Sequence, residues 1–245
     1  MALQGVIFDV GGTIVEYDGA RGWEWPGLDA FRETLVRFGH DAPTTEACLA
    51  VHEREVENFY QRLELDPHAN HTHDEIFSAI LAEAGVTLTP AQWDEARTAY
   101  YRASHAHVRL VPGIVETVRG VVARGLRVGV VSNTTWPGPE LDRLLDNLGV
   151  GAHLPVRFYS ADEAAWKPWP HIFERALAAL GLAPAEAAYV GDVPAFDVRG
   201  AQCAGMRAVW LNRRGRPPAD GLVADATIGA LPDLLPVVDR WMAEP

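Results

Sequence analysis

The sequence predicts an α/β fold in which a parallel sheet, covered by helices on both faces, is interrupted by a small domain of helices. Three observations indicate this fold. An apolar segment, 3–10, ends at two glycines and predicts a short buried strand. From about 26 to 107, apolar residues recur with helical spacing. After Pro112 and Gly113 helix and strand patterns alternate, which is typical of a parallel sheet.

The inserted stretch predicts only helices. Segments rich in Gly, Pro, Asp and Thr interrupt it and favour turns. The four predicted helices lie near 26–38, 43–64, 73–85 and 89–106. We therefore expect a separate helical domain formed by residues 17–107.

The alternating part predicts nine elements. Its helices are expected over 113–124, 138–148, 170–180, 195–204 and 230–241, and its strands over 126–132, 156–160, 187–191 and 207–211. The first strand is too apolar to stand alone, so we expect it to join this sheet. Residues 1–16 and 108–245 would then form one Rossmann-like, doubly wound core domain.

The composition excludes several classes of partner. The chain has 245 residues, of which 48% are hydrophobic, yet no apolar run reaches the roughly 18 residues that a membrane helix needs. The formal charge of −12 argues against nucleic acid and anionic membranes. No secretory signal is visible, and Cys48 and Cys203 are the only cysteines, which leaves one disulfide open. We expect a cytoplasmic monomer or homodimer.

Lysine occurs once in the chain. Of the 21 basic residues, Lys167 alone is not arginine. A coding bias toward arginine would spare a lysine either by chance, on the surface, or where a planar guanidinium could not replace a compact ammonium. We favour a functional role for Lys167.

Polar residues follow the predicted strands at their carboxyl ends, where ligands of such sheets bind. They are Asp9 after the first strand, Ser132 and Asn133 after the second, Lys167 in the loop after the third, and Asp192 and Asp197 after the fourth. We expect these side chains to meet in one crevice. Carboxylates, a hydroxyl and a lysine together are typical of a metal-assisted reaction on an anionic substrate.

These residues, in this order, resemble the motifs of the haloacid dehalogenase (HAD) superfamily, whose members are mostly phosphatases. The first motif, Asp-x-Asp-Gly-Thr, appears as Asp9-Val10-Gly11-Gly12-Thr13. The Ser or Thr of the second is Ser132, and the Lys-Pro of the third is Lys167-Pro168. The fourth, Gly-Asp-x-x-x-x-Asp, spans 191–197. The resemblance covers nearly the whole chain, and the helical domain is similar to the family's α-helical cap.

The resemblance implies a role for each motif residue. Asp9 would be the nucleophile that forms an aspartyl-phosphate intermediate with a small phosphorylated metabolite. Mg²⁺ would be bound by Asp9, the main-chain carbonyl of Gly11, Asp192 and, directly or through a second layer of contacts, Asp197. Substrate oxygens would be bound by Gly12, Thr13, Ser132, Asn133 and Lys167, of which Ser132 and Lys167 would also be catalytic.

Two of these residues also have a structural interpretation. Ser132 could cap the turn after its strand. Asp197 could be an acidic residue that stabilises the dipole at a helix N-terminus.

Gly11 departs from the family pattern. Typical phosphatases of the family have a second Asp here, which protonates the leaving group and then activates water. Such acid–base catalysis contributes about 10²–10⁴ in rate. The enzyme could instead use substrates with good leaving groups, recruit Glu16, Tyr17 or Asp18 as the acid, or bind a ligand in a regulatory role without efficient turnover.

Dehalogenases of the superfamily are the main alternative, because a leaving halide needs no proton. They resemble the chain at Asp9, Ser132-Asn133 and Lys167-Pro168. However, they have Tyr in place of Gly11 and an uncharged residue in place of Asp192, so Asp192 favours a magnesium-dependent phosphatase. The turn 9–13 is also similar to the phosphate-binding turn of actin-like sugar kinases, but those continue into a β-hairpin, whereas a helical stretch follows here.

Three histidines, His68, His71 and His73, precede a predicted helix and suggest zinc. Their spacing is imperfect, and no cysteine nearby completes a four-ligand site. The segment 72–75, Thr-His-Asp-Glu, instead fits a capping box that begins a helix. We therefore do not favour zinc at these three residues.

Overall fold

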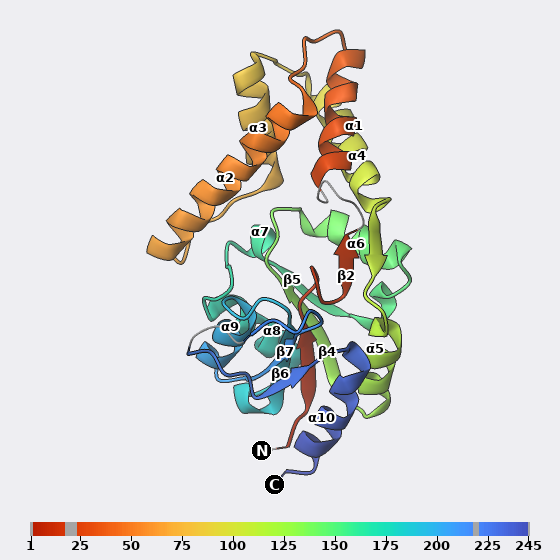
Figure 1. Cartoon of the computed structure of the whole chain (residues 1–245), viewed down its shortest axis with the longest axis vertical. Helices are drawn as coiled ribbons and strands as arrows, with labels where there is room; N and C mark the ends of the chain where they lie inside the picture. The colour runs from red at the N-terminus through yellow and green to blue at the C-terminus, as the bar shows by residue number, and fades with distance from the viewer. Residues whose placement is uncertain (1, 18–23, 218–220, 245) are drawn as a thin grey trace. The chain divides into compact units, whose positions relative to one another are not determined.

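The structure is a computed structural model that describes residues 2–17, 24–217 and 221–244. Its contacts divide the chain into an α/β unit, Met1–Glu16 with Leu110–Pro245, and a helical unit, Tyr17–Arg109. The α/β unit contains a six-stranded sheet with helices on both faces, and the helical unit contains α1 to α4 (Figure 1). The predicted fold class is therefore confirmed.

The sheet has the strand order β5-β4-β1-β6-β7-β8. Its strands are β1 (Gly5–Phe8), β4 (Arg127–Ser132), β5 (Val156–Tyr159), β6 (Ala187–Gly191), β7 (Arg207–Leu211) and β8 (Ala226–Ile228). All pair in parallel, and Phe8 of β1 lies between Val130 of β4 and Val190 of β6. The chain builds the sheet outward on one side of β1 and then on the other. The carboxyl ends of β1 and β6 therefore flank the switch point, where open α/β sheets bind ligands.

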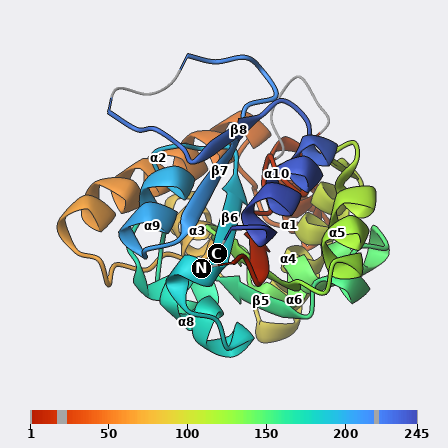
Figure 2. The same cartoon turned by 90° about the horizontal axis from the view of Figure 1, so that it is seen from below.

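Helices cover both faces of the sheet (Figure 2). On one face lie α5 (Ile114–Ala123) and α10 (Leu234–Met242), and on the other lie α8 (His171–Leu180) and α9 (Asp197–Cys203). The shorter elements are α6 (Gly138–Asn147), α7 (Ser160–Glu163) and the 3₁₀ turns η1 (Gly151–His153), η2 (Pro184–Glu186) and η3 (Leu231–Asp233). Because both faces are covered, every residue of β1 and β6 is buried, which explains their continuous apolar sequence.

The helical unit is built from α1 (Glu24–Arg37), α2 (Thr45–Leu65), α3 (His73–Ala84) and α4 (Pro90–His105). The starts of these helices follow from local capping. The Thr44 hydroxyl accepts from Ala47 N at the start of α2, and the Glu75 carboxylate accepts from Thr72 N at the start of α3, as the capping-box interpretation predicts. Gly85 ends α3 in the left-handed conformation.

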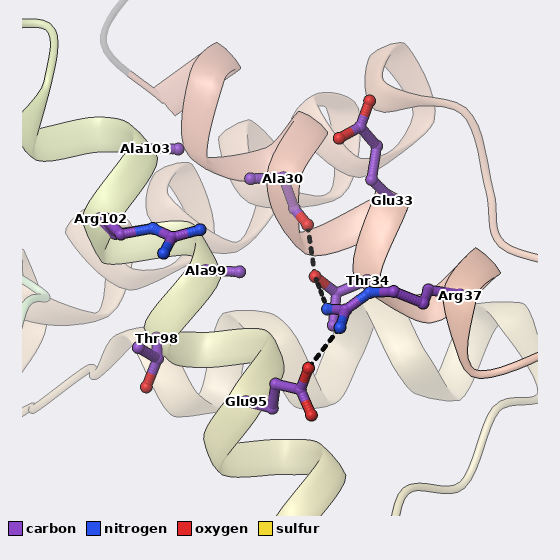
Figure 3. A pocket seen from close by; sticks show the side chains of 9 residues that line it. All are labelled: Ala30, Glu33, Thr34, Arg37, Glu95, Thr98, Ala99, Arg102 and Ala103. Carbon is purple, nitrogen blue, oxygen red and sulfur yellow. Dashed lines mark hydrogen bonds and ion pairs between the residues drawn. The ribbon is translucent and has the colours of Figure 1, made fainter.

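Helices α1 and α4 lie side by side within this unit (Figure 1). Gly27 permits their close approach, because a Cβ atom there would lie 2.2 Å from Ser104 Oγ and 2.5 Å from the Tyr100 ring. Further along the pair, the helices leave an open hollow of about 610 Å³, lined by Ala30 and Ala99 among others (Figure 3). The Arg37 guanidinium donates to the Glu95 carboxylate across this hollow, at 2.5 Å.

A second sheet pairs β2 (Val15–Tyr17) with β3 (Val108–Leu110), the two segments in which the chain passes from one unit to the other. Across the ranges that the structure describes, none of the helices combines the length and the apolar content that a membrane span requires.

Candidate active site

The loop after β1 forms a tight turn that places Asp9 at the switch point. Ile14 N and Val15 N both donate to the Val10 carbonyl, and Gly12 N donates to the Val15 carbonyl. Gly12 adopts a φ of +76°, and a Cβ atom at this position would lie 2.6 Å from the Asp192 carboxylate. Only glycine meets both conditions. The turn therefore brings the first and fourth motifs into direct contact.

The environment of Gly11 is different from that of its neighbour. A Cβ atom built at Gly11 meets no atom of the described residues within 4 Å, and the φ of Gly11 lies outside the left-handed region. The backbone here would accept a side chain. The missing second Asp of the first motif is therefore not explained by a lack of space.

Lys167 connects two of the predicted carboxylates. Its ammonium group is 2.8 Å from Asp9 Oδ1 and 2.7 Å from Asp197 Oδ1. The third proton goes to the Tyr189 hydroxyl at 2.8 Å, and that hydroxyl donates to the Val131 carbonyl. Lys167 is only 2% exposed, so a buried ammonium has partners for all three of its protons. A surface lysine spared by chance would not be placed in this way.

Sequence reasoning missed Tyr189. It lies in the middle of β6, where an aromatic residue among apolar neighbours reads as core. Its ring does pack against Phe173 of α8, but its hydroxyl holds Lys167. Tyr189 could have been recognised from the fact that a tyrosine hydroxyl in a buried strand requires a hydrogen-bond partner.

Asn133 and Ser132 lie at the end of β4, beside the lysine loop. The Asn133 side chain accepts from Lys167 N at 2.8 Å and donates to the Lys167 carbonyl at 2.9 Å. It therefore holds the main chain that carries the lysine. Ser132 is buried, and its hydroxyl donates to the Asn133 carbonyl at 3.4 Å, a local contact of the kind expected from a strand-end cap. Thr13 is fully buried in the turn after Asp9.

The fourth motif supplies two carboxylates with different contacts. Asp197, at the start of α9, accepts from Lys167 with one oxygen and from Val193 N with the other, at 2.8 Å. A Cβ atom on Gly191 would lie 2.3 Å from the Asp197 carboxylate, so the glycine of the motif leaves room for it. By contrast, Asp192 Oδ1 is buried and accepts no hydrogen bond from any described residue.

Asp9, Asp192 and Asp197 could together bind a metal ion, because one carboxylate oxygen from each lies within 4.8 Å of the others. When all three are ionised, the buried Lys167 balances one negative charge, and the half-exposed Arg216, 3.7 Å from Asp192 Oδ2, offsets part of another, so the cluster stays negative. Burial raises the pKa of Asp9 to about 7 and that of Asp192 to about 6, with further raising by the neighbouring carboxylates. The charge and the oxygen ligands both suit a hard divalent cation such as Mg²⁺.

The electrostatics of Lys167 follow from the same cluster. Burial alone would lower the pKa of its ammonium, but Asp197 and Asp9 reverse that effect and raise the pKa above its usual value. Lys167 is therefore a permanent positive charge beside Asp9.

Of the three alternative acids, Glu16 and Tyr17 are described residues of β2. The Glu16 carboxylate accepts from Arg213 at 2.7 Å, which already engages it in an ion pair. Asp18 lies outside the described residues. The structure thus brings together Asp9, Gly12, Lys167, Asp192 and Asp197, with Asn133 held against the main chain of Lys167.

The site can be compared with known families. The profile of the haloacid dehalogenase-like hydrolases matches residues 3–205, a range that contains all four motifs. The chain belongs to the haloacid dehalogenase-like hydrolase family. The resemblance expected from the motifs is therefore confirmed.

Relatives of this HAD-like hydrolase include phosphatases and a dehalogenase. Phosphoserine phosphatase of Thermus thermophilus is 35% identical over 159 residues, a match that covers 64% of this chain and 61% of that protein. Glyceraldehyde 3-phosphate phosphatase of Methanopyrus kandleri is 28% identical over 242 residues, covering 96% of this chain and 97% of the relative. A crystal structure of 2-haloacid dehalogenase from Pseudomonas syringae pv. Tomato superimposes with a TM-score of 0.76, at 27% identity and 98% and 99% coverage.

Proposed function

We propose that this HAD-like hydrolase is a magnesium-dependent phosphatase that uses Asp9 as its nucleophile and acts on a small phosphorylated metabolite. Asp192 carries the proposal. It adds a carboxylate, with one buried oxygen that accepts no hydrogen bond from a described residue, to the cluster around Asp9. By the family resemblance, dehalogenases would have an uncharged residue in place of Asp192. The relatives named as phosphoserine and glyceraldehyde 3-phosphate phosphatases support a small phosphorylated substrate.

The proposed reaction has two steps. Asp9 attacks phosphorus, so that a bond from its carboxylate to phosphorus forms while the bond to the leaving oxygen breaks. Water then attacks the aspartyl phosphate and releases inorganic phosphate. Because Lys167 donates to Asp9 Oδ1, we assign Oδ2 as the attacking oxygen, and Oδ1 keeps a second lone pair that would serve the metal ion. The ammonium group of Lys167 also offsets the negative charge of the phosphoryl group in both steps.

We assign Mg²⁺ to Asp9, Asp192 and, as the family resemblance implies, the main-chain carbonyl of Gly11. Each oxygen of Asp197 accepts a hydrogen bond, from Lys167 and from Val193 N, whereas Asp192 Oδ1 accepts none from a described residue, so we assign Asp197 to positioning the lysine. When bound, the ion would supply positive charge that reduces repulsion between Asp9 and an anionic substrate. The Gly11 carbonyl can serve whatever the side chain at this position is.

Gly11 leaves no general acid at its position, so we expect the substrate to have a good leaving group. An acyl or aryl phosphate expels a weakly basic oxygen that needs little protonation. An alkyl phosphate expels a strongly basic alkoxide and would lose the roughly 10²–10⁴ in rate that a positioned acid contributes.

The test is phosphate release from acetyl phosphate, an aryl phosphate and an alkyl phosphate, with and without Mg²⁺. We expect the first two to be hydrolysed in a Mg²⁺-dependent way, and Asp9→Asn and Asp192→Asn to abolish this activity. Activity that persists in Asp9→Asn would contradict the nucleophile. Activity that persists in EDTA would contradict the proposed requirement for Mg²⁺.

A dehalogenase is the second candidate, favoured by the structural similarity to 2-haloacid dehalogenase and by Gly11, since halide needs no proton. Halide release from a 2-haloacid in EDTA, without phosphate release from the panel, would replace the phosphatase proposal. Failure of both assays would leave a ligand-binding role. We further propose a cytoplasmic monomer or homodimer; Cys48 and Cys203 are both free thiols, which fits a reducing compartment.

A further inference from the structure

A second group of metal-ligating side chains lies entirely within the helical unit. It consists of Glu24 at the start of α1, His52 in the middle of α2 and His73 at the start of α3. The three side chains are buried, with exposed fractions of 5%, 7% and 0%. One ligand atom from each lies within 4.8 Å of the others. The proposed phosphatase mechanism does not use any of them.

The contacts between these residues suit a shared ion. His52 Nε2 lies 3.0 Å from Glu24 Oε1, and His73 Nε2 lies 3.7 Å from Glu24 Oε2. Zinc–ligand bonds of about 2.0–2.2 Å in a tetrahedron place neighbouring ligand atoms roughly 3.3–3.6 Å apart. The two observed separations lie on either side of this range. They involve different oxygens of Glu24, so one ion would be bound either by both oxygens of the carboxylate or by one oxygen after a side chain has turned.

Glu24 has an incomplete set of partners for a buried carboxylate. Tyr100 of α4 donates to Glu24 Oε2. Glu24 Oε1 is also buried, but it accepts no hydrogen bond from a described residue, although His52 Nε2 is near. A buried anion is costly without a cation or full hydrogen bonding, and a bound divalent ion would supply the missing charge.

The side chains around Glu24 and His73 also resemble the surroundings of known metal sites. The Tyr100 hydroxyl fixes the orientation of the carboxylate, as outer hydrogen bonds to metal ligands do. The His73 ring contacts Phe77 and Tyr101, so aromatic side chains exclude water from this side. Two imidazoles and one carboxylate suit zinc and similar transition metals, whereas Mg²⁺ and Ca²⁺ prefer oxygen ligands alone.

We propose that Glu24, His52 and His73 form a binding site for Zn²⁺ or a similar divalent transition metal that joins α1, α2 and α3. The site is separate from the proposed catalytic cluster and does not depend on the proposed function. Its expected effect is to stabilise the helical unit, because the three ligands lie far apart in the sequence and come together only when it folds.

The test uses the full chain carrying Asp192→Asn, which removes a ligand of the catalytic cluster. After dialysis against EDTA and then against Zn²⁺, we expect one equivalent of bound zinc by elemental analysis and a raised thermal midpoint. His52→Gln should lose both effects. His71→Gln is the matched control, since His71 is also buried but stacks on Phe59 and is not one of the proposed ligands.

A second measurement keeps the proposal testable if His52→Gln does not fold. Tyr100→Phe keeps every proposed ligand and removes the hydroxyl that donates to Glu24, so it should weaken zinc binding about 10–100-fold. Co²⁺ bound to the unsubstituted site should give the intense visible absorption of a four-coordinate ion. No bound zinc in the parent chain, or equal zinc binding by His52→Gln and His71→Gln, would overturn the proposal.

Discussion

The two adjacent glycines of the first motif are under opposite constraints. Gly12 has a positive φ and no space for a Cβ atom, because the Asp192 carboxylate lies against it. Gly11 has an ordinary φ and open surroundings. The glycine at position 12 is therefore required by the structure, whereas the one at position 11 is not. The absence of a general acid at position 11 is a chemical property of the site that one substitution can reverse.

Gly11→Asp is expected to add the missing acid without disturbing the turn. If the aspartate reaches the leaving oxygen, alkyl phosphate hydrolysis should rise by about 10²–10⁴. Aryl phosphate hydrolysis should change less where the first step limits its rate, because that leaving group needs little protonation, whereas activation of water in the second step would help both substrates equally. Steady-state kinetics on both substrates measure the difference. Gly11→Asn is the matched control, since it has the same shape and no acid. Equal rates for the two variants would show that the new carboxyl does not act as an acid.

Lys167 is the residue on which the charge balance of the site depends. It lies between Asp9 and Asp197, and its third proton is taken by Tyr189. An arginine would not fit the same three partners, because its planar group directs its protons differently. This explains why a chain with 20 arginines keeps one lysine.

Lys167→Met should therefore destabilise the fold as well as abolish activity. The substitution keeps most of the side-chain volume but leaves two buried carboxylates without their cation, which typically costs about 3–5 kcal/mol. Urea denaturation of the protein in EDTA measures the loss. Arg175→Gln is the control, because it breaks an ion pair with Glu163 in which the arginine is half exposed. A similar change for the two variants would contradict the buried role of Lys167.

At the scale of elements, sequence patterns located the long helices and missed the short strands. The four helices of the helical unit begin and end within two residues of their predicted bounds, because helical spacing over 12 or more residues and clear caps define them. The strands β2, β3 and β8 have three residues each, too few to show an alternating pattern. Just before β8, the Asp225 carboxylate accepts a hydrogen bond from Ala208 N, which the sequence pattern does not predict.

The contact of α1 with α4 should be sensitive to side-chain volume at Gly27. A valine there would meet Ser104 and Tyr100 at distances that side chains cannot occupy. Overpacking of this kind costs about 1–3 kcal/mol, more than the gain from replacing a helical glycine, which is under about 1 kcal/mol. We therefore expect Gly27→Val to lower the thermal midpoint measured by far-UV circular dichroism.

Ala99→Val is the matched control for this prediction. Ala99 belongs to the same helix pair but lines the open hollow, where the two added methyl groups have space (Figure 3). We expect it to shift the midpoint far less. If both valine substitutions lowered the midpoint equally, general intolerance of the helix pair, and not the contact at Gly27, would be the cause.

At the scale of the whole molecule, the grouping of the motif residues could be predicted because topology and chemistry agree. The carboxyl ends of parallel strands share one edge of the sheet, so residues 158 positions apart, Asp9 and Lys167, were expected to meet. No comparable rule of topology predicts that the proposed zinc ligands meet. Sequence proximity singled out His68, His71 and His73, whereas the structure groups His73 with Glu24 and His52 from two other helices. The rotation of each helix about its axis determines which side chains of different helices meet. The sequence alone does not show this rotation.

The overall charge leads to a prediction about how the substrate arrives. A chain with a formal charge of −12 repels a phosphorylated substrate at long range, and salt screens this repulsion beyond a Debye length of about 10 Å at 0.1 M ionic strength. At constant Mg²⁺, we expect kcat/KM for an aryl phosphate to rise with added NaCl, while kcat stays nearly constant. Steady-state kinetics over a range of NaCl concentrations measure both.

The opposite trend would point to a local basic surface that attracts the substrate. Arg213 is paired with Glu16, and Arg216 lies 3.7 Å from the Asp192 carboxylate, so Arg214 is the arginine between them to test. If kcat/KM falls with salt, and Arg214→Gln removes that fall, attraction by this segment outweighs the negative charge of the whole molecule. If Arg214→Gln leaves an increase with salt unchanged, the net charge controls the encounter, as we predict.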